Sequence, residues 1–181
     1  MRSQTRARSL RLIAFATAIA GVVVLLGLRS QVGQNGPVPT TQPVTVEYEY
    51  AAGQPSTWGV SIPPPEGHVA ATVTAVELQG VTGLDVVGIQ ACDTTVGGCS
   101  LVNAPGWPPS GIATLQIEGL SIAPTGTGPV YQILIGVSRR ADASIGSATA
   151  VKVTYAVGGT TYEVVEPWTL RIFAPGAMPA S

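Results

Sequence analysis

Near its N-terminus the chain carries an uninterrupted run of seventeen uncharged residues, Leu12 to Leu28, which reads LIAFATAIAGVVVLLGL. As a helix rising about 1.5 Å per residue it would be roughly 25 Å long. That is slightly short for a hydrocarbon core of about 30 Å, and Leu10 with a snorkelling Arg11 would extend it. The run predicts a single transmembrane helix over residues 12–28, so the lipid bilayer is the first expected partner of the chain.

Basic residues around this run predict its orientation. Arg2, Arg6, Arg8 and Arg11 precede it, whereas only Arg29 follows directly. Because positive charge is retained on the cytoplasmic side, residues 1–11 are expected in the cytoplasm and the chain beyond Arg29 outside the cell. We interpret the run as an uncleaved signal-anchor.

A cleaved signal peptide is the competing interpretation. Ala18-Ile19-Ala20 is an A-x-A site, and the nine residues before Gly21 could serve as a short hydrophobic region. Cleavage there would expose Val22 to Leu26 at the new N-terminus, which water disfavours. In an intact anchor, Ala14, Ala18 and Gly21 would form a stripe of small residues suited to helix packing in the membrane.

The composition of the exterior part argues for a folded, acidic domain. Four basic and all ten acidic residues follow Arg29, which gives this part a net charge of −6. Such a charge disfavours nucleic acid as a partner. With only 10% charged residues but 22 Gly and 15 Pro, the chain is too apolar for a disordered tail and suits short strands joined by turns.

Two cysteines predict one disulfide. Cys92 and Cys99 are the only cysteines, and an oxidising exterior would join them around Asp93 to Gly98. In the chain-entropy model, closing such a loop stabilises the folded state against unfolding by about 2.5 kcal/mol. Two thiolates without further ligands make a poor metal site, so we expect a structural bridge.

Alternating apolar residues predict the strands. A Gly/Pro/Thr-rich linker over 29–43 precedes a domain over 44–173, and a loose tail over 174–181 follows. Strands are expected at 44–50, 58–62, 68–79, 84–91, 112–122, 131–138 and 151–157, and at 160–165 continuing through 168–172, with a loop at 103–111. Gly158-Gly159 predicts a type I′ hairpin turn. The fold class is therefore all-β, an antiparallel two-sheet sandwich preceded by one transmembrane helix.

The closing strands carry a family resemblance. The segments YQILIGV, AVKVTYAVGGTTYEV and WTLRIF lie between Tyr131 and Phe173, about a quarter of the chain. They resemble single-pass, membrane-anchored Ig-like β-sandwich proteins of high-GC Gram-positive bacteria. The resemblance implies an Ig-like fold and a place in the bacterial plasma membrane, with the domain extracytoplasmic. It implies no catalytic residues.

Chemistry-bearing patterns are sparse. His68, the only histidine, starts a strand without a supporting G-x-S-x-G motif, and Lys152, the only lysine, is expected as a solvated charge on an outer strand. Glu47, Glu49, Glu163 and Glu166 are expected on outer faces, with a calcium site as the alternative. Phosphate-binding glycine motifs are absent, so no cofactor is expected and the protein is interpreted as non-enzymatic.

Two of the three tryptophans remain as candidates for contact with a partner. Trp107 with Pro108 lies on a stiff proline-rich loop, and Trp58 follows a polar turn, although either indole could instead pack over the core. Trp168 fits the inward phase of its strand. We expect a membrane-tethered binding module that contacts a protein through Trp107, Pro108, Trp58 and the disulfide loop. The alternative is a structural accessory subunit of a larger membrane complex.

Overall fold

The computed structural model of the chain describes residues 36–96, 99 and 103–179. The chain divides into two units, residues 1–34 and 35–181, and every described strand lies in the second. In the described part no helix is long and apolar enough to cross a membrane. The predicted span 12–28, with Ala14, Ala18 and Gly21, falls outside the described residues.

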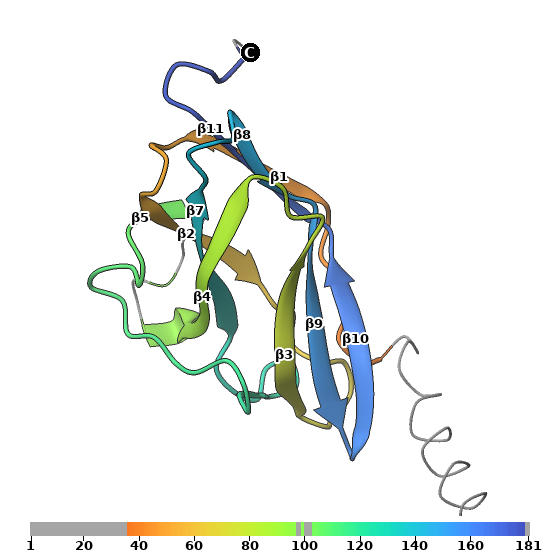
Figure 1. Cartoon of the computed structure of the whole chain (residues 1–181). Helices are drawn as coiled ribbons and strands as arrows, with labels where there is room; N and C mark the ends of the chain where they lie inside the picture. Colours follow the sequence, from red (N-terminus) through yellow and green to blue (C-terminus); the bar gives the residue numbers. More distant parts are fainter. Residues whose placement is uncertain (1–35, 97–98, 100–102, 180–181) are drawn as a thin grey trace, which may run out of the picture. The chain divides into compact units, whose positions relative to one another are not determined.

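Eleven strands and one 3₁₀ turn make up the described domain (Figure 1). They are β1 Val44–Glu49, β2 Pro55–Ser61, β3 Ala71–Gln79, β4 Leu84–Asp93, the turn η1 Thr94–Val96, β5 Asn103–Pro105, β6 Ser121–Ile122, β7 Tyr131–Arg139, β8 Ile145–Ala148, β9 Ala150–Val157, β10 Thr160–Glu166 and β11 Trp168–Phe173. The expectation of an all-β domain is confirmed.

The strands form three sheets, with orders β10-β9-β3-β6, β4-β7-β2-β5 and β1-β11-β8. Figure 1 shows β3, β9 and β10 side by side, with the β4-β7-β2 layer beside them. All pairs are antiparallel except β1 with β11, where Val44 lies opposite Trp168 and Glu49 opposite Phe173. The purely antiparallel expectation therefore fails for this one pair.

The last hairpin follows the prediction closely. β9 and β10 pair antiparallel from Val157 opposite Thr160, and the two glycines between them have φ values of 58° and 84°. Two positive φ values are what a type I′ turn requires. The chain does not continue in this sheet beyond Pro167, which has no N–H to donate. Instead β11 joins the sheet of β1 and β8.

Alternate residues of the two larger sheets share one core. Trp58, Val60 and Ile135 from the β4-β7-β2-β5 sheet and Val73 and Tyr155 from the β10-β9-β3-β6 sheet are all at most 1% exposed and belong to one apolar cluster. Burying a large aliphatic or aromatic side chain stabilises a fold by roughly 1.5–3 kcal/mol. The third sheet also reaches this core through Leu170 and Ile172 of β11, so the expected division into two sheets is incomplete. Sheets facing one core are nevertheless consistent with a β-sandwich.

Residues 103–122 depart most from the predicted pattern. The segment expected as a strand over 112–122 is largely loop, with only β6 at its end and a single bridge between Leu115 and Ala91. Gly111 and Gly119, with φ values of 76° and 82°, turn the chain where a strand would have to run straight. The expected loop at 103–111 instead begins with β5, which pairs with β2.

Both ends of the predicted domain extend further than expected. Part of the predicted linker, residues 36–43, belongs to the same unit as the strands, and Val38 is only 5% exposed. Part of the predicted loose tail is also attached, because the Met178 N–H donates to Glu49 Oε1 at 3.0 Å. The folded domain therefore includes residues on both sides of 44–173.

Candidate contact surface

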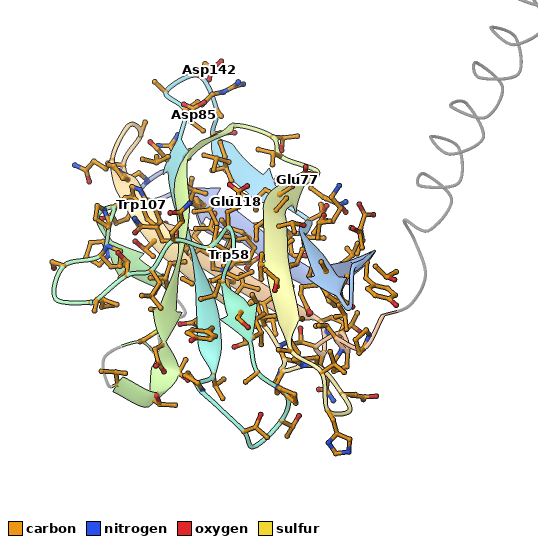
Figure 2. The ribbon with its side chains drawn as sticks, turned by 90° about the horizontal axis from the view of Figure 1, so that it is seen from below. Trp58, Glu77, Asp85, Trp107, Glu118 and Asp142 are labelled. Carbon is orange, nitrogen blue, oxygen red and sulfur yellow. A yellow bond between two sulfur atoms is a disulfide. The ribbon has the colours of Figure 1, made fainter. Side chains whose placement is uncertain are left out.

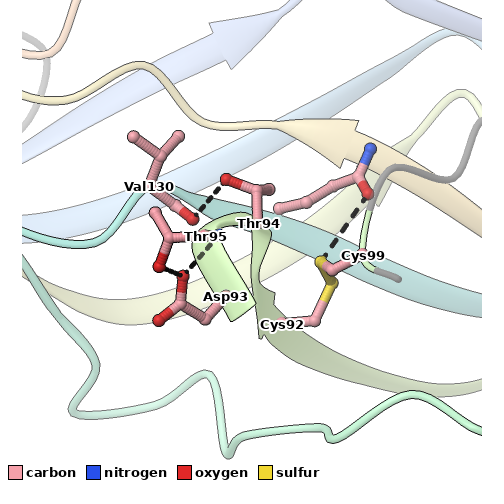
Figure 3. The surroundings of a disulfide bond; sticks show 7 residues. Cys92, Asp93, Thr94, Thr95, Cys99 and Val130 are labelled. Carbon is pink, nitrogen blue, oxygen red and sulfur yellow. Dashed lines mark hydrogen bonds between the residues drawn. A yellow bond between two sulfur atoms is a disulfide. The ribbon is translucent and has the colours of Figure 1, made fainter. Parts of the chain in front are cut away.

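The predicted disulfide is present. It joins Cys92, near the end of β4, to Cys99, with 5.9 Å between the two Cα atoms, within the usual range for a bridge (Figure 3). Both cysteines are at most 2% exposed. The bridge therefore lies inside the domain and fixes the loop that leaves β4.

Hydrogen bonds shape the start of the disulfide loop. Asp93 Oδ1 accepts from the Thr95 N–H at 2.8 Å and from Thr95 Oγ1 at 2.6 Å. The N–H and Oγ1 of Thr94 both donate to the carbonyl of Val130 at 2.8 Å, so the turn is fastened to the segment entering β7 (Figure 3). With the backbone held on both sides, the Val96 side chain points into solvent at 75% exposure.

Trp107 packs flat against two glycines on neighbouring strands. Gly88 of β4 and Gly136 of β7 are direct cross-strand partners. A Cβ added to Gly88 would lie 2.7 Å from Trp107 Nε1, and one added to Gly136 would lie 2.6 Å from Trp107 Cγ. The absence of two side chains thus creates the seat for one indole.

Backbone contacts hold the loop that carries this indole. Thr57 Oγ1 donates to the carbonyl of Gly106 at 2.7 Å, and the Gly106 N–H donates to the carbonyl of Pro55 at 2.9 Å. The Trp107–Pro108 peptide bond is cis. Trp107 is half-buried and Pro108 exposed, so of these two predicted contact residues Pro108 is the more accessible.

Trp58 is not available to a partner. It lies opposite Ile135 on the inward face of β2 and has an exposed fraction of 0%. Figure 2 shows it inside the domain. The predicted contact role of Trp58 is therefore wrong, because strand alternation directs this residue into the core.

The disulfide and Trp107 meet in a second, smaller apolar cluster. Its fully buried members are Cys92, Cys99 and Leu134, and Trp107 and Ile112 pack against it. Leu134 of β7 faces this cluster, while Ile133 and Ile135 face the main core. β7 is consequently covered on both faces, by the sandwich core on one and by the loops on the other.

An open groove lies between the disulfide loop and the segment after Trp107. It has a volume of about 330 Å³ and is lined by Asp93, Val96, Cys99, Gly111, Ile112, Ala113 and Leu115, so one carboxyl group lies among mainly apolar residues. Leu115 is 41% exposed, and Val130, tied to the turn at Thr94, is 44% exposed. We call this feature the disulfide groove. Apolar side chains of the groove are exposed to solvent, and the Cys92–Cys99 disulfide holds the backbone that carries them.

The titratable residues named from the sequence lie elsewhere. Lys152 is on β9, an inner strand, and its Nζ lies 2.7 Å from Glu77 and 3.7 Å from Glu163. The bond to Glu77 raises the pKa of Lys152, and a lysine that acts as a base needs the opposite shift. The expectation of an outer strand for Lys152 is wrong. His68 is exposed in the loop before β3.

Of the named carboxylates, Glu47 forms a 2.9 Å ion pair with Arg171, but Glu166 is fully buried, which corrects its expected outer-face position. No group of three or more potential metal ligands occurs within residues 36–96, 99 and 103–179.

The sequence alone did not predict the packing of the Trp107 indole on Gly88 and Gly136, nor the disulfide groove. Gly88 and Gly136 were a usable signal, since glycine inside a strand often marks the close approach of another group. The residue that approaches them could not be identified from spacing, because Trp107 reaches them from a loop.

No protein-family model and no curated protein matches the chain. Among solved structures it is similar to the VesB protease of Vibrio cholerae, with TM-score 0.37 and 9% identity over 76% of this chain and 32% of that one. It is also similar to the CupB6 tip adhesin of Pseudomonas aeruginosa, with TM-score 0.28 and 10% identity over 78% of this chain and 42% of that one. The chain thus spans less than half the length of either, and likenesses this distant carry no argument about activity.

Proposed function

We propose that this protein is a non-enzymatic interaction module, tethered by residues 12–28 to the outer face of a bacterial plasma membrane, whose domain binds a protein through the disulfide groove. In the same proposal the sheets form an Ig-like sandwich carried on one N-terminal transmembrane helix. The observation that carries the proposal is the groove itself. Val96 and Leu115 are exposed in it although the main core buries most other large apolar residues.

The construction of the groove supports a binding role. Exposed apolar side chains gain most from a partner when the surface is already rigid, because less conformational freedom is lost on association. Here the backbone is held by the disulfide and by the two bonds from Thr94 to Val130. Trp107, which we expected to contact the partner directly, would instead support the groove by packing against the same buried cluster as Ile112.

Capture from gently solubilised membranes tests this function. The full chain should retain a protein partner, and the variant Leu115→Asp should retain at least tenfold less, because a charge buried against an apolar partner is strongly unfavourable. Val69→Asp is the matched control, since Val69 is equally apolar, 54% exposed and outside the groove. Equal loss in both variants, or no loss in either, contradicts the proposal.

The alternative, that the chain is a structural accessory subunit of a membrane complex, predicts a different elution behaviour in the same membrane extract. If the chain is a fixed subunit whose helix packs through Ala14, Ala18 and Gly21, it should elute with other membrane proteins even when it carries Leu115→Asp. A free monomer would exclude this alternative.

A further inference from the structure

Residues 36–43, which we call the strap, are tied to the domain by separate hydrogen bonds, most of them to side chains, rather than by strand pairing. The strap precedes β1, and Val38 in its middle is buried. The Val38 N–H donates to the Tyr155 hydroxyl at 3.2 Å, and the carbonyl of Pro37 accepts from the Glu66 N–H at 2.6 Å. Each of these bonds reaches a different part of the domain.

The first residue of the strap passes very close to a stacked tyrosine pair. The rings of Tyr155 and Tyr162 lie 5.7 Å apart and nearly parallel. A Cβ added to Gly36 would lie 2.7 Å from Tyr162 Cγ, so only glycine allows the backbone this approach. Burial raises the pKa of Tyr155 above its ordinary value of 10.0, and its hydroxyl accepts the bond from Val38.

The other end of the strap is held by three linked polar groups. Thr41 donates to Glu166 Oε2 twice, from its N–H at 2.8 Å and from Oγ1 at 2.6 Å. The same Oγ1 accepts from Trp168 Nε1 at 2.7 Å. Glu166 is fully buried, and its Oε1 has no hydrogen-bond partner among the described residues. A buried carboxylate is costly, and Thr41 supplies the bonds that offset part of this cost.

We propose that Thr41, Glu166 and Trp168 form a latch that reversibly fastens the strap to the completed sandwich. The strap adds no strand to a sheet, so its release leaves the ladders of β9, β10 and β11 intact. Release would add eight residues to the tether, which can span at most roughly 29 Å. It would also uncover Tyr155 and remove one wall of the cavity of about 430 Å³ that the strap forms together with Val164. The importance of tether length rests on the proposed membrane attachment.

Amide hydrogen exchange of the full chain in detergent micelles tests the latch. In the wild type we expect the Val38 and Thr41 amides to be protected. Thr41→Val removes the hydroxyl that both donates and accepts, and should speed their exchange about tenfold or more while β9 and β10 exchange as before. Thr41→Ser retains the hydroxyl and should restore wild-type protection. Thr40→Val, at an exposed neighbouring position, is the matched control.

The latch would be overturned by unprotected strap amides in the wild type, by unchanged exchange in Thr41→Val, or by exchange that rises equally in the strap and in β9. A Thr41→Val chain that does not fold would also overturn it, because the strap would then be inseparable from the fold. The measurement needs no partner, so its outcome is independent of whether the disulfide groove captures a protein.

Discussion

At the residue scale, Gly88 and Gly136 leave space on the sheet because they have no side chains, and the Trp107 indole packs into this space. Each lies in a strand, where glycine usually weakens the sheet, and together they accept the face of Trp107. The indole covers backbone that would otherwise face solvent, and it packs against the cluster of Leu134 and the disulfide. Cys99 and Ile112 take part both in this packing and in the lining of the disulfide groove, whereas Trp107 does not line the groove.

Gly136→Ala tests this seat. Its Cβ would lie 2.6 Å from Trp107 Cγ, so the indole has to move, and overpacking of this kind costs about 1–3 kcal/mol. Urea unfolding should show this loss. In a Trp107→Ala background the same substitution should cost much less, because the clashing ring is gone. Equal costs in both backgrounds would mean that Trp107 does not occupy the seat.

Glu49 makes attachment of the C-terminal tail dependent on pH. Backbone N–H groups of Gly176 and Met178 bind its carboxylate and lower its pKa below the ordinary value of 4.5. Since the folded pKa is the lower one, this attachment is fully present above the unfolded pKa and is lost as the pH falls through the folded value.

We expect the protection factor of the Met178 amide to be constant above about pH 5 and to fall in stronger acid. In Glu49→Gln the amide oxygen still accepts but does not titrate, so this fall should disappear. If acid releases the tail equally in both proteins, another group is responsible.

At the element scale, local patterns predicted most of the strands, and long-range contacts determined what the patterns could not. The β9–β10 hairpin was predictable because alternation, turn glycines and pairing all involve neighbouring residues. The parallel β1–β11 pair was not, since it joins the first and last strands of the domain. Likewise the local pattern predicts that Trp58 begins a strand over 58–62, whereas β2 begins at Pro55 and holds Trp58 in its buried interior.

The disulfide loop is the element whose stability is easiest to measure. Reduction should lower the free energy of unfolding by about 2.5 kcal/mol, the value expected from loop-closure entropy for this spacing. Urea unfolding with and without reductant measures this difference. The Cys92→Ala/Cys99→Ala variant is the control and should not respond to reductant. A reduced protein as stable as the oxidised one would show that the bridge is not needed to hold the groove.

For the whole molecule, composition predicted an acidic all-β domain, and the structure extends that domain into residues expected to be linker and tail. The attachment of the strap to the domain could not be predicted, because its Gly, Pro and Thr residues have the composition of a flexible spacer. Its hydrogen bonds also reach residues more than a hundred positions away in the sequence. Binding surfaces are difficult to predict for the same reason. Val96 and Leu115 are well separated in sequence and share one groove only after folding.

Site-specific photocrosslinking in intact cells tests the central claim most directly. A photoreactive residue at position 96, in place of Val96, should join the membrane-bound chain covalently to another protein. The same residue at position 145 should not, although Ile145 is also apolar and 45% exposed, because it lies on β8 outside the groove. Adducts at both positions alike, or at neither, would contradict a protein-binding disulfide groove.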